Sequence, residues 1–386
     1  MAGDWSGQAE GARRAAATLR PSIVINNFNH GRYVGAAIDS ALAQTVPDVE
    51  VVVVDDGSTD DSRDVIRRYA DQAVLVFKQN GGQGSAINAG FARCTGDVII
   101  FLDSDDLLVA DALERILPCF SDAAIGKVHW PMLKVGMHGE RLGLWPATPI
   151  PDGDLRGRVC RDGPSTIAWP AQANAWSRRL LERILPMPAE LYRTCADTYL
   201  FELAPYLAPM KTIADPLMLY RQHPGNTYRT RGFEQTLAME LRFADHYSTL
   251  AAKLCESHGC EVDRGRWRAN CWWYRLRDAA DSIERSIPDG ERFMLIDDAA
   301  WAMDRLGART AIPFPERDGT YAGPPADDQS AVEELDRQHR AGARFVVIGW
   351  QSSWWFEHYR VFAGHLLAVA TERERNDNLR IFELCA

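Results

Sequence analysis

The sequence has 386 residues, which is more than one compact domain usually holds, so it predicts two domains. Its hydrophobic fraction of 46% and charged fraction of 25% are those of an ordinary globular protein. A net charge of −10 argues against nucleic acid and against an anionic membrane as the main partner. No apolar run approaches the ~18 residues of a transmembrane segment, so we expect none.

The amino terminus and the cysteines bear on where the protein works. Residues 1–20 are rich in Ala, Gly and Arg but lack the apolar stretch of a signal peptide, so they predict a mobile tail. The eight cysteines are scattered and form no CxxC pair. They indicate reduced thiols in a cytoplasmic protein and argue against a zinc site or a disulfide framework.

Short apolar segments alternate with helical patterns over the first hundred residues. The strand-like segments are 22–26, 49–54, 73–77 and 98–102, and helical spacing follows each of the first three. This order predicts an α/β fold with a mostly parallel, Rossmann-like sheet flanked by helices. Ligands of such sheets bind beyond the carboxyl ends of the strands.

The segment 97–106 is the most informative of the chain, because a fully apolar strand ends there in Asp103, Asp105 and Asp106. Clustered carboxylates repel one another and resist burial, so the cluster predicts a hard divalent cation, Mn²⁺ or Mg²⁺. The alternative is that Asp103 or Ser104 caps a helix over about 107–117, which needs only one acid.

Familiar phosphate-binding motifs are missing from the sequence. The first strand is followed by Asn-Asn-Phe-Asn-His-Gly, which is not the GxGxxG of a dinucleotide site. The loop 80–84 is rich in glycine but contains no lysine, so turn glycines explain it better than a phosphate loop.

Three segments in order resemble the motifs of family 2 inverting glycosyltransferases with the GT-A fold: 22–29, 51–60 and 101–106. The resemblance covers about residues 20–230. It implies a nucleotide-diphosphate sugar donor, such as a UDP-sugar, a Mn²⁺ or Mg²⁺ ion, and transfer to an acceptor hydroxyl.

The resemblance also assigns roles to residues of the first three motifs. Phe28 and Asp56 would hold the nucleotide base, with Asn27 in the same loop, while Asp103 would contact the ribose or the metal shell and Asp105 would bind the metal. One departure is Ala86, which precedes Asn88 by two residues in a region where many members carry an Arg before the Asn. The cationic contact to the diphosphate is therefore unassigned in this helix.

Two later segments complete the site that the resemblance implies. Asp197 opens a helical segment and would be the catalytic base, although a first-turn acid is also favoured by the helix dipole alone. The preceding position, often Glu in the family, is Ala196, and Glu190 and Glu202 are the next carboxylates to test.

An apolar strand at 216–220 delivers Arg221 and His223 into a turn. The resemblance implies that His223 is the second metal ligand and that Arg221 contacts the diphosphate. A lone histidine is more often structural, and this alternative stays open.

The remaining chain predicts accessory parts. We expect a tail at 1–20, a GT-A domain at 21–230, a helical segment at 231–288 and a small α/β domain at 289–386. In the last part we expect helices over 298–306, 327–341 and 354–370, and we expect a long loop over 145–162. The segment after 288 shows no cluster that predicts chemistry, so packing, dimerisation and acceptor binding are open roles.

Two other classes compete with the glycosyltransferase interpretation. A sugar-nucleotide pyrophosphorylase, or another nucleotidyltransferase, would be expected to carry a basic, glycine-rich loop after the first strand, and this chain has none there. A non-catalytic nucleotide-sugar-binding protein would keep the acids only as caps. The sequence names neither the sugar nor the acceptor, which could be a saccharide, a lipid-linked group, a peptide or a natural product, and it leaves homo-oligomerisation open.

Overall fold

The computed structural model describes residues 19–137, 139–146, 149–167, 169–225 and 231–385. Contacts divide the chain into two compact units. The first comprises the residues up to 229 together with Phe243–Trp267, and the second comprises 230–242 together with Arg268–Ala386. Most of the predicted tail lies outside the described residues, and the domain boundaries predicted at 230 and 288 stay predictions.

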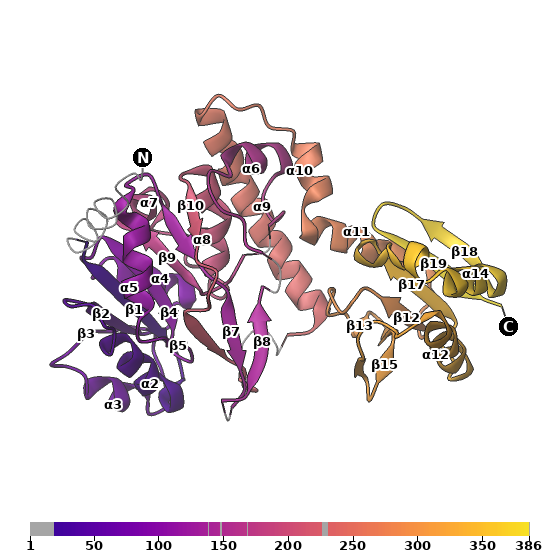
Figure 1. Ribbon diagram of the computed structural model, residues 1–386, viewed down its shortest axis with the longest axis horizontal. Coiled ribbons are helices and arrows are strands. Elements are labelled where there is room, and N and C mark those ends of the chain that lie inside the picture. The colour runs from indigo at the N-terminus through magenta and orange to yellow at the C-terminus, as the bar shows by residue number, and fades with distance from the viewer. Residues whose placement is uncertain (1–18, 138, 147–148, 168, 226–230, 386) are drawn as a thin grey trace, which may run out of the picture. The chain divides into compact units, whose positions relative to one another are not determined.

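The first unit is built on a seven-stranded sheet with the order β10-β6-β9-β4-β1-β2-β3 (Figure 1). The strands β3, β2, β1 and β4 run parallel to one another, as do β10 and β6, whereas β9 runs antiparallel to both β4 and β6. This sheet confirms the predicted α/β class. Its strands are β1 (Pro21–Asn27), β2 (Glu50–Asp55), β3 (Val74–Phe77), β4 (Val98–Asp103), β6 (Lys127–His129), β9 (Asn174–Ser177) and β10 (Met210–Thr212).

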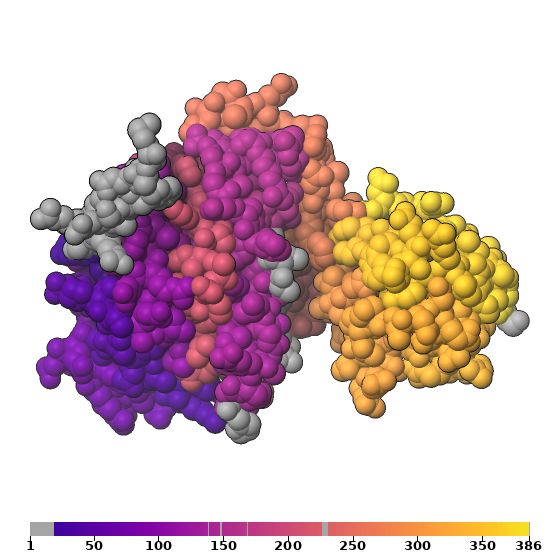
Figure 2. Space-filling model, in the orientation of Figure 1, coloured from indigo at the N-terminus to yellow at the C-terminus, as the bar shows by residue number. Residues whose placement is uncertain are grey.

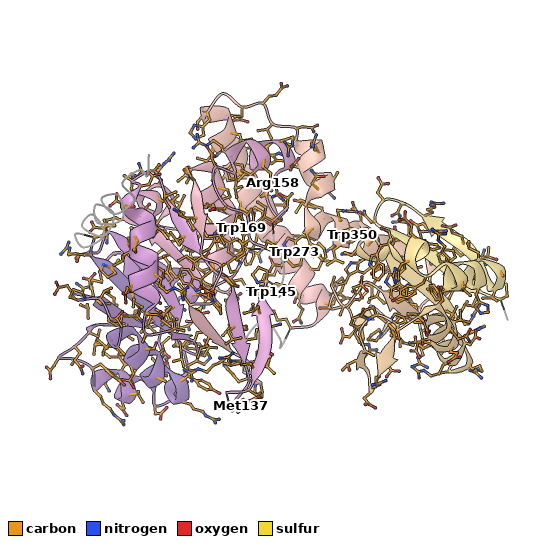
Figure 3. The ribbon with its side chains drawn as sticks, in the orientation of Figure 1. Met137, Trp145, Arg158, Trp169, Trp273 and Trp350 are labelled. Carbon is orange, nitrogen blue, oxygen red and sulfur yellow. The ribbon has the colours of Figure 1, made fainter. Side chains whose placement is uncertain are left out.

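A second, four-stranded sheet has the order β5-β11-β7-β8, and β5 is the next strand after β4 in the chain. Its strands are β5 (Leu107–Leu108), β11 (Met218–Arg221), β7 (Met132–Val135) and β8 (Arg141–Trp145). Met137 follows β7 at the outer end of the β7–β8 hairpin (Figure 3). In the space-filling view the first hundred described residues, in indigo and purple, form one contiguous part of the unit (Figure 2).

The helices of the first unit fill the connections between strands. They are α2 (Gly31–Leu42), α3 (Ser62–Arg67), α4 (Gln83–Phe91), α5 (Ala112–Ile116), η1 (Leu117–Ser121), α6 (Arg156–Asp162), α7 (Arg178–Ile184), α8 (Asp197–Leu203), η2 (Ala204–Tyr206), the later part of α9 (Phe233–Ser257) and most of α10 (Arg264–Asn270). The long loop predicted at 145–162 is wrong in its second half, where α6 forms. No described helix is long and apolar enough to cross a membrane.

The segment after β4 differs from the predicted helix over 107–117. Leu107 and Leu108 form β5, which pairs with Leu219 and Met218 of β11, and α5 begins only at Ala112. The hypothesis that Asp103 or Ser104 is a helix N-cap is therefore wrong, because no helix starts beside them.

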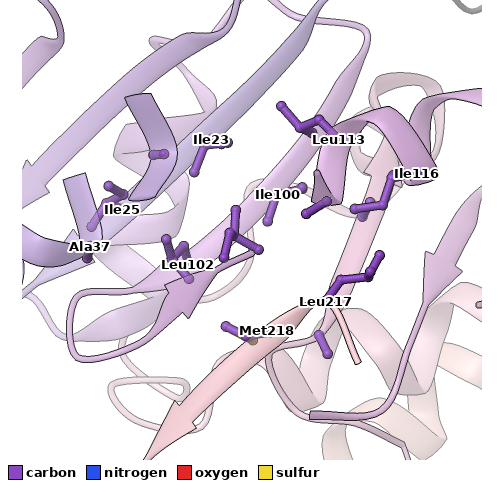
Figure 4. Packing of buried hydrophobic residues seen from close by; sticks show 14 of the residues in the cluster. Ile23, Ile25, Ala37, Ile100, Leu102, Leu113, Ile116, Leu217 and Met218 are labelled. Atoms are coloured by element: carbon purple, nitrogen blue, oxygen red, sulfur yellow. The ribbon is translucent and has the colours of Figure 1, made fainter. Parts of the chain in front are cut away.

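One hydrophobic core supports the edge of the sheet where the acids lie. Ile23 and Ile25 of β1 pack with Ile100 and Leu102 of β4, and Leu113 of α5 belongs to the same cluster (Figure 4). The β-branched residues in these strands suit a pleated surface buried on both sides. The core thus fixes the strand ends from which the polar side chains project.

The second unit contains a six-stranded sheet in the order β13-β14-β12-β17-β19-β18. Its strands are β12 (Arg292–Ile296), β13 (Arg305–Leu306), β14 (Arg309–Pro313), β17 (Phe345–Gly349), β18 (Ala370–Arg375) and β19 (Leu379–Leu384), with a small pair of β15 (Glu316–Arg317) and β16 (Thr320–Tyr321). Its helices are α11 (Trp272–Ser286), α12 (Asp328–Arg340), η4 (Trp350–Ser352), α13 (Trp355–His358) and α14 (Arg360–Val369).

The helix predicted at 298–306 is wrong. Asp298, Ala299 and Ala302 have positive φ angles of 51°, 58° and 51°, which no right-handed helix accommodates. The carboxylate of Asp297 accepts hydrogen bonds from the backbone N–H groups of Ala299 and Trp301 and so stabilises a turn in place of the helix.

The core of the first unit yields a stability prediction. Ile100 is 1% exposed, so Ile100→Ala should lower the free energy of unfolding by about 2–5 kcal/mol, since it removes buried methyl groups and leaves a cavity. Urea unfolding measures this change. Leu142→Ala, at a side chain that is 47% exposed, is the control and should stay within about 0.5 kcal/mol of wild type. Equal losses for the two variants would contradict the assignment of the core.

Candidate active site

Strand register brings the polar residues of three segments to one edge. Asn26 of β1 pairs with Asp103 of β4, and Asn27 pairs with Asp55 of β2. The side-chain amide of Asn26 donates a hydrogen bond of 2.7 Å to Oδ1 of Asp103. The carboxyl ends of β1, β2 and β4 therefore form the predicted site edge.

Asp105 and His223 are in contact although 118 residues separate them in the chain. Nε2 of His223 lies 3.0 Å from Oδ2 of Asp105, and both residues are buried. The His223 ring stacks on Tyr33 at 4.6 Å between centroids, and it meets the ring of His30 edge-on at 5.7 Å. β11 thus delivers His223 to the acidic loop after β4.

The donor atoms at this point fit a divalent ion. One ligand atom from each of His30, Asp105 and His223 lies within 4.8 Å of the others, and Asp103, Asp105 and Asp106 form a second such group. Carboxylate and imidazole ligands together suit Mn²⁺, whereas the acids alone suit Mg²⁺ as well.

The electrostatics of the acids also favour a bound cation. Burial raises the pKa of Asp103 to about 8 and the pKa of Asp106 well above its usual range, and the charge of the neighbouring Asp105 is the second cause for both. Oδ2 of Asp106 is buried and has no hydrogen-bond partner among the described residues. A cation would relieve the repulsion within this cluster.

Arg221 lies beside the acidic cluster. Its backbone N–H donates to Oδ1 of Asp106 at 3.0 Å, and its guanidinium lies 5.4 Å from the centroid of the Tyr33 ring. Arg221 is the last residue of β11 and His223 lies two residues further on, so the same strand places a cation and a metal-ligand candidate at the site.

The residues predicted for the base lie farther along the edge. Phe28 is 44% exposed in the loop after β1, so its ring is accessible to a planar ligand. The side-chain amide of Asn27 donates to Asp55 and Ser58 at 3.1 Å each, which ties the two loops together.

Asp56 has a strong structural role. It is 2% exposed, its carboxylate pairs with Lys78, and it accepts hydrogen bonds from the backbone N–H groups of Gly81 and Gly82. Since Asp56 binds these two amides, turn glycines explain the loop 80–84 better than a phosphate site does.

The side chain of Gln83 joins Asp103 to the start of α8. Its Nε2 donates to Oδ1 of Asp103 at 3.2 Å, and its Oε1 accepts from the backbone N–H of Ala196 at 3.0 Å. Asp197 is the next residue and the first of α8. Burial raises the pKa of Asp197 to about 7, so its carboxylate is poised to exchange a proton near neutrality.

The two other carboxylates considered for the base lie elsewhere. Glu190 is solvent-exposed at 92% of its side chain. Glu202 is buried and accepts hydrogen bonds from the N–H and hydroxyl of Ser165. Of the three acids, Asp197 is the one that acts electrostatically on Asp103.

Sequence reasoning missed His30, Gln83 and Lys78. His30 could have been found, because a histidine in the loop after the first strand must lie at the site edge. Gln83 and Lys78 gave no such signal, since their roles depend on side chains that are distant in sequence.

Comparison with known proteins identifies the family of the chain. The sequence model of the family described as Glycosyl transferase family 2 matches residues 22–129. An uncharacterized glycosyltransferase of Nostoc sp. is 36% identical over 215 residues, which cover 54% of this chain and 67% of that relative. The chain belongs to glycosyl transferase family 2.

Other similarities of this family 2 glycosyltransferase are shorter or more distant. An uncharacterized glycosyltransferase of Rickettsia prowazekii is 40% identical over 94 residues, covering 24% of this chain and only 30% of the relative. The crystal structure of S. aureus TarS aligns over 69% of this chain and 73% of the other, with 16% identity and a TM-score of 0.47.

The ligand geometry predicts the effect of removing one acid. Asp105→Ala should abolish the stabilisation of the protein by Mn²⁺ plus nucleoside diphosphate, because it removes the carboxylate common to both candidate ligand groups. The shift in Tm is measured by thermal unfolding with and without Mn²⁺ and UDP. Each ligand is added at about 1 mM, on the order of 100 times a typical Kd. Asp122→Ala, at an exposed acid of the same unit, is the control. An unchanged shift in Asp105→Ala would exclude Asp105 as a ligand.

The raised pKa of Asp103 predicts a pH effect on the metal-free protein. A carboxyl group with a pKa of about 8 when folded, against an ordinary 3.8, keeps its proton in the folded state and loses it on unfolding. Stability should therefore fall as the pH rises from about 4 to about 8. Asp103→Asn removes this contribution, so its stability relative to wild type should increase between pH 5 and pH 8 in urea titrations with EDTA. Parallel pH dependences would contradict the raised pKa.

Proposed function

We propose that this glycosyltransferase is a metal-dependent inverting enzyme that transfers a sugar from a nucleotide-diphosphate donor to an acceptor hydroxyl. The observation that supports this most is the bridge made by Gln83, whose side chain connects Asp103 to the backbone N–H of Ala196. The next residue is Asp197, a carboxylate with a pKa of about 7. UDP-sugars are the first donors to test.

The donor site in this proposal follows the edge of the sheet. The exposed ring of Phe28 stacks on the base. Asp56 and Asn27, which are buried and fixed by hydrogen bonds, bind the base together with it. Asp103 contacts the ribose or the metal shell, and Arg221 contacts the diphosphate. A guanidinium suits this contact, because it binds phosphate oxygens in a bidentate manner.

Asp105 and His223 would hold the metal, and His30 is a further ligand candidate. When bound, a divalent ion would neutralise charge on the departing diphosphate as a Lewis acid. Asp105 is 8% and His223 7% exposed, so both side chains are largely shielded from bulk water.

Asp197 accepts the proton of the acceptor hydroxyl. The hydroxyl oxygen attacks the anomeric carbon, the bond from that carbon to the diphosphate oxygen breaks, and the proton moves to the Asp197 carboxylate. A single base on the side opposite the leaving group permits one displacement, and one displacement inverts the anomeric configuration.

Two rival functions make different demands. A nucleotidyltransferase needs cationic or free amide donors for a triphosphate, but Asp56 already binds the amides of Gly81 and Gly82. A non-catalytic binding protein would bind the nucleotide-sugar without releasing the nucleoside diphosphate. Assay of UDP- and GDP-sugars for metal-dependent release of nucleoside diphosphate separates these cases, and binding without release would refute the proposed activity.

The proposed base predicts a specific kinetic defect. Asp197→Asn keeps the shape of the side chain but cannot take up a proton, so turnover should fall by about 10²–10⁴-fold while the affinity for UDP stays near that of wild type. Release of nucleoside diphosphate and UDP binding by calorimetry measure the two quantities. Glu190→Gln, at an exposed carboxylate nearby, is the matched control and should retain activity. A fully active Asp197→Asn enzyme would show that another residue is the base.

A further inference from the structure

The first unit contains a buried lysine that interacts electrostatically with the candidate base. Lys127 of β6 is 0% exposed, and its Nζ has no hydrogen-bond partner among the described residues. Its neighbour in the strand, Val128, belongs to the main hydrophobic core, so Lys127 points to the opposite face of the sheet. A lysine is almost never fully buried without a compensating interaction, and this one therefore needs an explanation.

Two indole rings enclose the amino group. Nζ lies 4.2 Å from the centroid of the Trp169 ring and 5.2 Å from that of Trp176. Trp176 is the register partner of Lys127 on β9, and both tryptophans are buried. Trp169 lies among the elements of the first unit (Figure 3). Tryptophan faces attract a cation best of all side chains, so this enclosure favours the ammonium form.

Two carboxylates of α8 supply the opposite charge. Glu202 and, to a smaller extent, Asp197 act electrostatically on Lys127 and favour its charged form. In return, Lys127 favours the ionised form of each carboxylate. Glu202 is fixed by Ser165, whose hydroxyl also bonds to Tyr247 of α9, so the position of this acid is well defined.

We propose that Lys127 is a positioning residue for the catalytic base: an ammonium group, held between Trp169 and Trp176, that supplies the positive charge facing Asp197 and Glu202. The inference rests on the proposed function, since it takes Asp197 to be the base. It adds a residue that contacts neither donor nor metal but sets the charge of the group that takes the proton.

The charge balance explains why such a residue is needed. Burial raises the pKa of Asp197 and of Glu202 to about 7 each, even with Lys127 opposing it. Burial also lowers the pKa of Lys127 well below its usual range. One ammonium, one carboxylate and one carboxylic acid form a neutral set, and the ionised member can be Asp197. Without Lys127, the pKa of each acid would rise further, which favours the protonated form, and a protonated Asp197 cannot accept a proton.

Three other groups that interact with this set carry no positive charge. Asp103, on the metal side, and Tyr220 of β11 both interact with Asp197, and neither brings a positive charge. His129 of β6 interacts with Lys127, and burial lowers the pKa of His129 to about 2, so this ring is neutral. Lys127 is thus the cation that α8 faces from β6.

The chain offers a direct test because it has only five lysines, Lys78, Lys127, Lys134, Lys211 and Lys253. Protein labelled with ¹³C at the lysine ε-carbons gives five signals whose shifts report the charge of each amino group. Loss of one signal in Lys127→Met assigns it, and Lys211→Met, at an exposed lysine of β10, is the control. Should Lys127→Met fail to fold, assignment of the other four by substitution leaves the fifth.

We expect the Lys127 signal to report an ammonium group at pH 7. In Glu202→Gln and in Asp197→Asn, its titration should move to lower pH by about one unit or more, since a facing carboxylate is lost. A neutral Lys127 at pH 7 in the wild type, or an unchanged titration in both variants, would overturn the proposal. This readout does not depend on turnover, so it can fail while Asp197 is still the base.

The pH dependence of activity is a second test of the role of Lys127. In Lys127→Met, release of nucleoside diphosphate at pH 7 should fall about tenfold or more and recover towards pH 9, since a raised pKa of the base costs tenfold per unit. Glu202→Gln should displace the acidic limb of the pH profile in the opposite direction, to lower pH. A Lys127→Met profile identical to that of Lys211→Met would refute the role of Lys127, and a fully active Asp197→Asn enzyme would refute the proposed base instead.

Discussion

The close approach of the loop 81–84 to the chain before α8 is the constraint on which the site depends. A Cβ at Gly82 would lie 2.6 Å from the Cα of Arg193, and Gly82 has a φ of 86°, so only glycine fits there without strain. The backbone N–H of Gln83 donates to the carbonyl of Arg193 at 2.8 Å, and its side chain then reaches both Asp103 and Ala196. One residue thereby sets the distance between the acids after β4 and the acid that opens α8.

The site concentrates buried carboxyl groups, which resist ionisation until a positive charge lies close to them. Burial raises the pKa of Asp103 and Asp106, and it also raises the pKa of Asp197 and Glu202. Arrangements of this kind are costly for folding and are found where a protein binds cations or moves protons. In the proposed enzyme the metal would balance the first pair and Lys127 the second, so donor binding and proton transfer have separate counter-charges.

The sequence predicted the α/β fold, and it singled out several polar residues that the structure brings together at the carboxyl edge of the sheet. The run of β-branched residues in β1, β2 and β4 leaves few alternatives to a parallel sheet, and acids directly after β4 must lie at its carboxyl edge. It failed after Asp106, because Leu107 and Leu108 have the composition of a helix start, and only pairing with β11 makes them a strand. It failed again at Asp298, where left-handed backbone conformations depend on hydrogen bonds to Asp297 that no periodicity reveals. Lys127 gave no signal either, since a lysine in a short segment is normally solvated and its two indole partners lie more than 40 residues away in the chain.

The central claim is that a single displacement, assisted by one base, transfers the sugar. The most direct test is the configuration of the first sugar released from an α-linked UDP-sugar, followed by proton NMR before the anomers equilibrate. The account predicts that the β anomer appears first, because attack opposite the leaving group inverts the anomeric carbon. Initial release of the α anomer would require two displacements or front-side attack, and it would contradict the role assigned to Asp197.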